Sequence, residues 1–89
     1  MAMTKPPISP NLNAIIYTRD FCAFCKQLKL YLEEKGVNVE ERNIDTHDKY
    51  AMELFDMGFS SVPVTIIGNT RILGFNSARL NKVLTNSAL

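Results

Sequence analysis

The sequence lacks an excess of charge of either sign, a long hydrophobic run and a large set of cysteines. Ten basic and nine acidic side chains leave a formal net charge of +1, which gives no electrostatic reason to expect nucleic acid or an anionic membrane as a partner. No apolar run approaches the roughly 18 to 20 residues that span a bilayer, and residues 1–7 carry no apolar core of a secretion signal. We therefore expect a cytoplasmic protein without membrane or nucleic-acid partners.

Two cysteines are too few for the disulfide framework of a small secreted protein, but Cys22 and Cys25 are separated by only two residues. In a reducing compartment such a pair is more often redox-active or metal-binding than structural, and a disulfide across so small a loop would add little stability. A zinc site needs four ligands, and within one chain only the two cysteines and His47 are candidates. We interpret His47 as a surface residue, expect no metal site, and interpret the pair as a redox dithiol.

The 89 residues fit a single α/β domain. Prolines and asparagines are concentrated near the start, so residues 1–12 are predicted to form a disordered lead-in and residues 13–89 the domain. The hydrophobic periodicity predicts the order β-α-β-α-β-β-α, giving a mixed sheet of four strands with three helices. The first two strands should be parallel because a helix crosses between them. The strands are expected near 14–17, 37–44, 62–67 and 70–73, and the helices near 23–35, 47–57 and 77–84.

Side chains that favour helix N-termini precede the two later helices. Asp45 or Thr46 is predicted to cap the second helix, and Ser77 the third. In the first helix, Cys25, Leu28 and Leu32 recur at helical spacing, so they are expected to share the buried face.

The two cysteines are expected to differ in ionisation. Cys22 lies immediately before the first helix, where free backbone N–H groups and the helix dipole favour a thiolate, and Arg19 and Lys26 can add positive charge. Cys25 lies one turn further on, on the buried face, where its thiol should remain protonated. The sequence therefore predicts that Cys22 attacks a substrate disulfide and that Cys25 resolves the mixed disulfide.

Three short stretches form a recognisable pattern: Cys22-Ala23-Phe24-Cys25 after a predicted strand, Ser61-Val62-Pro63-Val64 before another, and Gly74-Phe75 after a hairpin. With them the chain resembles the glutaredoxin family, and most closely its NrdH-redoxin branch. The resemblance covers about residues 14–85. It implies a thioredoxin/glutaredoxin fold with Pro63 in cis, although X–Pro bonds in general are mostly trans. It also implies that the backbone of Val62 pairs with an extended substrate segment beside Cys22.

The resemblance further implies a set of substrate or glutathione contacts, with departures from the usual pattern. Arg19 matches a basic residue that helps to hold a glutathione carboxylate, although an ordinary surface arginine is equally expected there. Phe24 stands in place of the usual tyrosine. After the hairpin, glutaredoxins typically have a second glycine and acidic residues, whereas this chain has Phe75, Asn76 and Ser77. Ser77 could still offer a helix N-terminus to an anionic group. The expected contacts are Arg19, Phe24, Val62, Pro63, Gly74, Phe75, Asn76 and Ser77.

We expect a monomeric thiol–disulfide oxidoreductase that reduces protein disulfides without a tightly bound cofactor. The resemblance implies ribonucleotide reductase as a target, and either glutathione or thioredoxin reductase as electron donor. Two alternatives stay open. One is an iron–sulfur protein, in which two subunits share a cluster with glutathione as an additional ligand. The other is a binding module without redox turnover, which would use the sheet edge and an aromatic rim of Phe21, Phe24, Phe59 and Phe75.

Overall fold

The computed structural model describes residues 12–87, and its elements follow the predicted order. The helices are α1 (Ala23–Glu34), α2 (Asp48–Asp56) and α3 (Ser77–Ser87). The strands are β1 (Asn13–Thr18), β2 (Asn38–Asn43), β3 (Val64–Ile67) and β4 (Thr70–Leu73). The predicted lead-in lies outside the described residues except for Leu12, which packs against the core.

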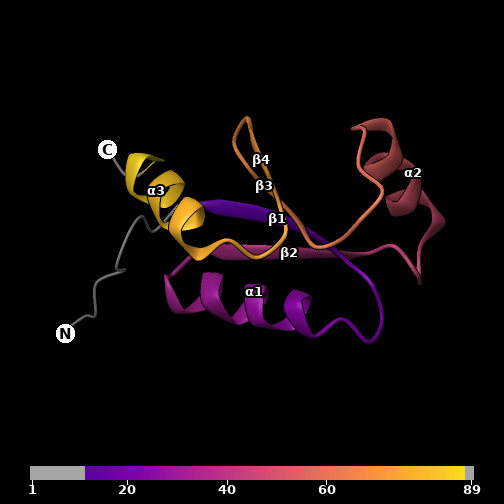
Figure 1. The fold of residues 1–89 in the computed structure, drawn as a ribbon, viewed down its shortest axis with the longest axis horizontal. Helices are drawn as coiled ribbons and strands as arrows, with labels where there is room; N and C mark the ends of the chain where they lie inside the picture. Colours follow the sequence, from indigo (N-terminus) through magenta and orange to yellow (C-terminus); the bar gives the residue numbers. More distant parts are fainter. Residues whose placement is uncertain (1–11, 88–89) are drawn as a thin grey trace.

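The four strands form one mixed sheet in the order β2-β1-β3-β4 (Figure 1). Strands β1 and β2 are parallel, as predicted from the helix that connects them, whereas β3 is antiparallel to both β1 and β4. The thioredoxin/glutaredoxin fold implied by the resemblance is confirmed. No helix within residues 12–87 is long and apolar enough to cross a membrane.

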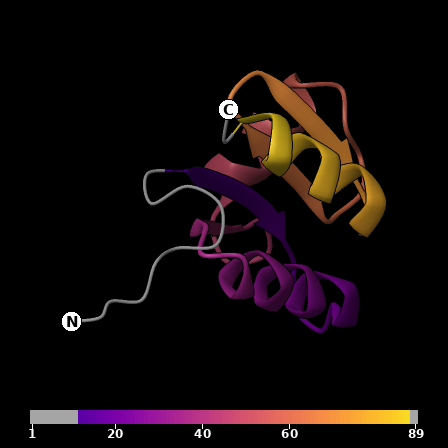
Figure 2. The same cartoon turned by 90° about the vertical axis from the view of Figure 1, so that its left-hand side faces the viewer.

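The two faces of the sheet bury separate apolar clusters. Helices α1 and α3 cover one face, with α3 beside the hairpin and α1 beneath β1 in the view of Figure 2. The main core there consists of Ala14, Ile16, Leu28, Leu32, Val37, Ile67, Ile72, Leu80 and Leu84. The smaller cluster on the other face joins Leu54 of α2 to Tyr17 and Val64. Because successive strand residues point to opposite faces, Ile16 and Tyr17 belong to different clusters.

Both predicted helix caps are wrong by one or two residues. The residue at the N-cap of α2 is His47, because Asp45 and Thr46 form a turn in which their backbone N–H groups donate to the Asn43 side-chain oxygen at 2.8 and 3.2 Å. At α3, Asn76 Oδ1 accepts a hydrogen bond from the backbone N–H of Arg79 at 3.0 Å. Asn76 is therefore the cap and Ser77 the first helical residue, in line with the strong preference for asparagine at this position.

The third strand is shorter than the sequence predicts. It begins at Val64, and the preceding Val62–Pro63 peptide bond is cis, as the resemblance implies. Tyr17 pairs with Val64, so Pro63 lies at the end of the sheet where β1 ends. The segment that carries the cysteines leaves the sheet at that same end.

Candidate active site

Cys22 and Cys25 are joined by a disulfide at the start of α1, with their Cα atoms 5.3 Å apart. Cys22 is the N-cap of α1, and its Sγ accepts a hydrogen bond from the backbone N–H of Cys25 at 3.2 Å. No acidic side chain lies in the first helical turn. The free N–H groups and the positive end of the helix dipole therefore favour negative charge on the Cys22 sulfur once the disulfide is reduced.

The two sulfur-bearing residues differ in exposure. Cys25 is only 4% exposed, whereas Cys22 is half-buried and flanked by the exposed rings of Phe21 and Phe24. Phe21 has φ of 57°, in the left-handed region that a bulky residue rarely adopts. This backbone conformation holds a fully exposed aromatic ring directly before Cys22. Cys22 is therefore the more exposed of the two cysteines, and the rings of its neighbours Phe21 and Phe24 offer exposed apolar surface.

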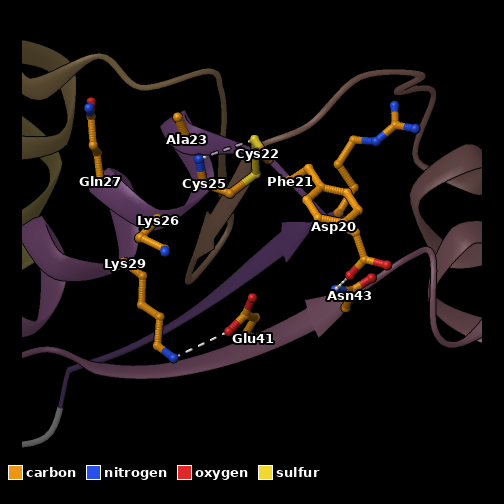
Figure 3. A pocket seen from close by; sticks show the side chains of 11 residues that line it. Asp20, Phe21, Cys22, Ala23, Cys25, Lys26, Gln27, Lys29, Glu41 and Asn43 are labelled. Atoms are coloured by element: carbon orange, nitrogen blue, oxygen red, sulfur yellow. Dashed lines mark hydrogen bonds and ion pairs between the residues drawn. A yellow bond between two sulfur atoms is a disulfide. The ribbon is translucent and has the colours of Figure 1, made fainter.

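A cavity of about 670 Å³ opens beside the disulfide, between the first turns of α1 and strand β2 (Figure 3). Its lining combines both cysteines with three cationic and two acidic side chains. The lining residues are Arg19, Asp20, Phe21, Cys22, Ala23, Cys25, Lys26, Gln27, Lys29, Glu41 and Asn43. Of the predicted substrate contacts, only Arg19 lines this cavity, together with the two cysteines predicted to be catalytic. Its Nε lies 3.8 Å from an Asp45 carboxylate oxygen, and its side chain is mostly exposed.

The predicted contacts from Val62 to Ser77 lie outside this cavity. The backbone N–H of Gly74 donates to the carbonyl oxygen of Pro63 at 2.8 Å, which joins the loop before β3 to the loop after β4. Phe75 is turned toward the core, where its ring meets that of Tyr31 edge-on at 5.6 Å. The structure thus brings Val62, Pro63 and Gly74 together as one group, and the polar cavity with Arg19 forms another.

Several cavity residues were not predicted from the sequence, above all Glu41 and Asn43 at the carboxyl-terminal half of β2. The parallel pairing with β1 matches Thr18 with Asn43, so both strands end beside the loop that carries the dithiol. In a β-α-β unit, the carboxyl ends of adjacent parallel strands meet at one edge of the sheet, where such folds bind ligands. This rule could have drawn attention to the polar residues of β2.

A second polar cluster lies on the opposite face, beneath α2. Tyr17 Oη donates to Glu53 Oε1 at 2.9 Å, and Arg42 Nη1 donates to the same two groups at 3.0 and 2.8 Å. Burial, followed by the hydrogen bond to Glu53, raises the pKa of the Tyr17 hydroxyl above its ordinary value. The hydrogen bond to Glu40 raises the pKa of the Arg42 guanidinium, which also lies over the rings of Tyr17 and Tyr50. The cluster anchors α2 to the sheet.

His47 is exposed, as predicted, and its Nδ1 lies 2.9 Å from the Thr46 hydroxyl. Across residues 12–87, no group of three or more histidine, cysteine, aspartate or glutamate side chains is arranged to hold a metal ion.

The glutaredoxin family model matches residues 14–72. The chain belongs to the glutaredoxin family. Relatives of this glutaredoxin include the glutaredoxin-like protein NrdH of Escherichia coli, 34% identical over 76% of this chain and 84% of the relative. NrdH of Lactococcus lactis is 29% identical over 76% of this chain and 94% of the relative. The solved structure of the E. coli NrdH-redoxin has a TM-score of 0.72 and 32% identity, and the match covers 80% of this chain and 93% of that one.

The family and the cysteine pair together support a thiol–disulfide oxidoreductase of the NrdH-like glutaredoxin type. The family match over residues 14–72 includes the dithiol loop.

Proposed function

We propose that this glutaredoxin reduces disulfides in protein substrates, with Cys22 as the attacking and Cys25 as the resolving residue. The observation that carries the proposal is the position of Cys22. Cys22 is half-buried and its sulfur accepts the Cys25 N–H at the N-terminus of α1, whereas Cys25 is buried one turn later. The roles follow because the thiolate is the nucleophile in thiol–disulfide exchange.

In the first step, the Cys22 thiolate attacks one sulfur of the substrate disulfide. The substrate S–S bond breaks, and its other sulfur leaves as a thiolate that takes a proton from water. In the second step, Cys25 attacks Cys22, which releases the second substrate thiol and forms the Cys22–Cys25 disulfide present in the structure. Two electrons pass from the dithiol to the substrate. The fixed proximity of the two sulfurs makes the second step intramolecular and therefore fast.

The group formed by Val62, Pro63 and Gly74 is proposed to hold the substrate backbone beside Cys22. The hydrogen bond between Gly74 and Pro63 fixes the two loops relative to each other. In this proposal the free backbone groups of Val62 pair with an extended substrate segment, and the exposed ring of Phe24 contacts its apolar side chains.

We propose thioredoxin reductase as the electron donor and ribonucleotide reductase as a target. The E. coli NrdH-redoxin, a relative in sequence and fold, is described as having a thioredoxin-like activity profile. In addition, the place of the second glycine is taken by Phe75, and Asn76 uses its side chain to cap α3. The segment Asn76-Ser77-Ala78 contains no carboxylate that could bind the amino group of glutathione.

The test is the reduction of an insulin disulfide, followed by NADPH consumption, with each donor supplied separately. One reaction contains thioredoxin reductase, and the other contains glutathione with glutathione reductase. We expect turnover with thioredoxin reductase and at least about tenfold less with glutathione, since contacts worth about 1.4 kcal/mol change a rate tenfold. Turnover with glutathione alone would overturn the proposed donor. Absence of turnover with both donors would overturn the reductase function.

A further inference from the structure

We propose that the Glu41 carboxylate accepts the proton of Cys25 in the step that closes the Cys22–Cys25 disulfide. This inference rests on the proposed function, because it concerns the second step of that reaction. Glu41 and Cys25 line the same cavity, although they come from β2 and α1. In Figure 3 the Glu41 carboxylate points upward, toward the side of the cavity where the disulfide lies.

The backbone geometry places Glu41 on the correct face of the sheet. Its register partner on β1 is Ile16, whose side chain is in the main core beneath α1. On α1, Cys25 and Lys29 are four residues apart, so their side chains lie one above the other on one helix face. Lys29 Nζ lies 3.2 Å from Glu41 Oε1. Glu41 is therefore held against the helix face that also carries Cys25.

Both carboxylate oxygens of Glu41 have a hydrogen-bond partner, although the side chain itself is exposed. Lys29 holds Oε1, and the Thr18 hydroxyl donates to Oε2 at 2.9 Å. Thr18 is only 1% exposed, so this second partner is anchored in the packed sheet. Two donors of this kind orient a carboxylate, as a proton acceptor must be before the transfer.

The other charged groups that face the cavity are less suited to this role. Arg19, Lys26 and Lys29 are basic side chains that act as hydrogen-bond donors. Asp20 is a carboxylate, but it belongs to the exposed loop before Phe21, where its Oδ1 accepts from Asn43 Nδ2 at 3.0 Å. Of the two carboxylates in the cavity lining, only Glu41 is itself a strand residue and bonds to a buried side chain, that of Thr18.

The second step requires loss of the Cys25 proton because a thiol attacks far more slowly than a thiolate. A cavity of about 670 Å³ that both residues line admits water, so the proton can pass from Cys25 Sγ through water to the Glu41 carboxylate. The Cys25 sulfur then forms its bond to Cys22 Sγ, and the bond between Cys22 and the substrate sulfur breaks. The electron pair leaves with the substrate sulfur as a thiolate. Glu41 afterwards returns its proton to bulk water.

The two chemical steps can be separated with the chromogenic disulfide 5,5′-dithiobis(2-nitrobenzoate). Attack by Cys22 releases one coloured thiolate and leaves the other as a mixed disulfide, and attack by Cys25 then releases the second. Stopped-flow absorbance of the reduced protein should therefore show two phases. The variant Glu41→Gln removes the charge at nearly constant size. The matched control is Glu34→Gln, which removes an exposed carboxylate from the last residue of α1.

We expect Glu41→Gln to slow the second phase by about 100-fold at neutral pH, the lower end of the range for loss of a general base. The difference should shrink at about pH 9.5, where a cysteine thiol ionises in water without help. Glu34→Gln should leave both phases unchanged. Thr18→Val, which keeps the carboxylate but removes its anchor, should slow the second phase by a smaller factor.

Three results would overturn the inference. They are an unchanged second phase in Glu41→Gln, a slowing by the same factor at every pH, and a Thr18→Val protein with a second phase as fast as the parent protein. Circular dichroism of each variant checks that the fold is retained. If the parent protein itself shows no second phase, the proposed function fails, so the two failures are distinguishable.

Discussion

The backbone N–H of Cys25 donates a hydrogen bond to Sγ of Cys22 at 3.2 Å. The helix that buries the second sulfur thus also stabilises negative charge on the first. Since both effects come from a single helix start, the difference between the sulfurs is built into the local backbone and does not depend on a distant side chain.

Cys25→Ser is expected to trap a mixed disulfide between Cys22 and a substrate cysteine, because no sulfur remains to displace the substrate. Cys22→Ser is expected to abolish the reaction, because Cys25 is buried. Mass spectrometry after incubation with a disulfide substrate measures the trapped adduct, and reductant releases it. Equal dithiol-dependent activity of the two variants would contradict the assigned roles.

Asn76→Ala should lower the free energy of unfolding by about 1 kcal/mol, the usual cost of losing an N-cap side chain. The reason is the lost hydrogen bond from the backbone N–H of Arg79 to Asn76 Oδ1. Ser77→Ala is the matched control and should change stability by less than about 0.5 kcal/mol, since Ser77 is exposed in the first turn. Urea denaturation measures both. A larger loss for Ser77→Ala would place the cap at Ser77 instead.

Leu28→Ala and Leu30→Ala compare the buried and exposed faces of α1. Leu28 is 0% exposed within the main core, and Leu30 is 54% exposed. The first change should cost about 2–5 kcal/mol because it leaves a cavity, and the second less than about 0.5 kcal/mol. For a domain of this size, a loss at the upper end could leave little folded protein. Similar denaturation midpoints for the two variants would show that the burial of α1 is assigned incorrectly.

Tyr17→Phe tests the polar cluster beneath α2. Because the folded state raises the pKa of Tyr17, the unfolded chain releases this proton at a lower pH than the folded protein does. The stabilisation is therefore complete below the ordinary tyrosine pKa of about 10, and it is lost as the pH rises through the higher folded value. The variant should be less stable by about 1 kcal/mol at neutral pH but should lose less stability above pH ~10. Denaturation at a series of pH values measures both effects. If the parent protein and Tyr17→Phe lost the same amount of stability above pH ~10, the raised pKa of Tyr17 would be contradicted.

The elements with strong local signals were predictable from the sequence. Leu28 and Leu32 recur at helical spacing, and the Gly68-Asn69 dipeptide predicts the turn between β3 and β4. The position of Cys22 at a helix start was also predictable, because the apolar pattern changes its period there.

The cavity depends on contacts that no local pattern encodes. Glu41 lies beside the dithiol only because β2 pairs with β1 in one particular register, and a shift by one residue would turn its side chain to the other face.

The cap of α3 shows a different limit of prediction from sequence. Asn76 and Ser77 are adjacent residues with similar capping preference, so propensity alone does not choose between them. The cis bond at Pro63 came from the family resemblance, since X–Pro bonds in general favour trans.

The outer strands of the sheet have a consequence for solubility. Strand β2 carries Glu40, Glu41 and Arg42 along one edge, and β4, at the other edge, has only four residues and an exposed Arg71. Charged side chains and short strands at an edge oppose pairing with the edge of another molecule. We therefore expect the two edges of the sheet to resist pairing with other molecules in concentrated solution.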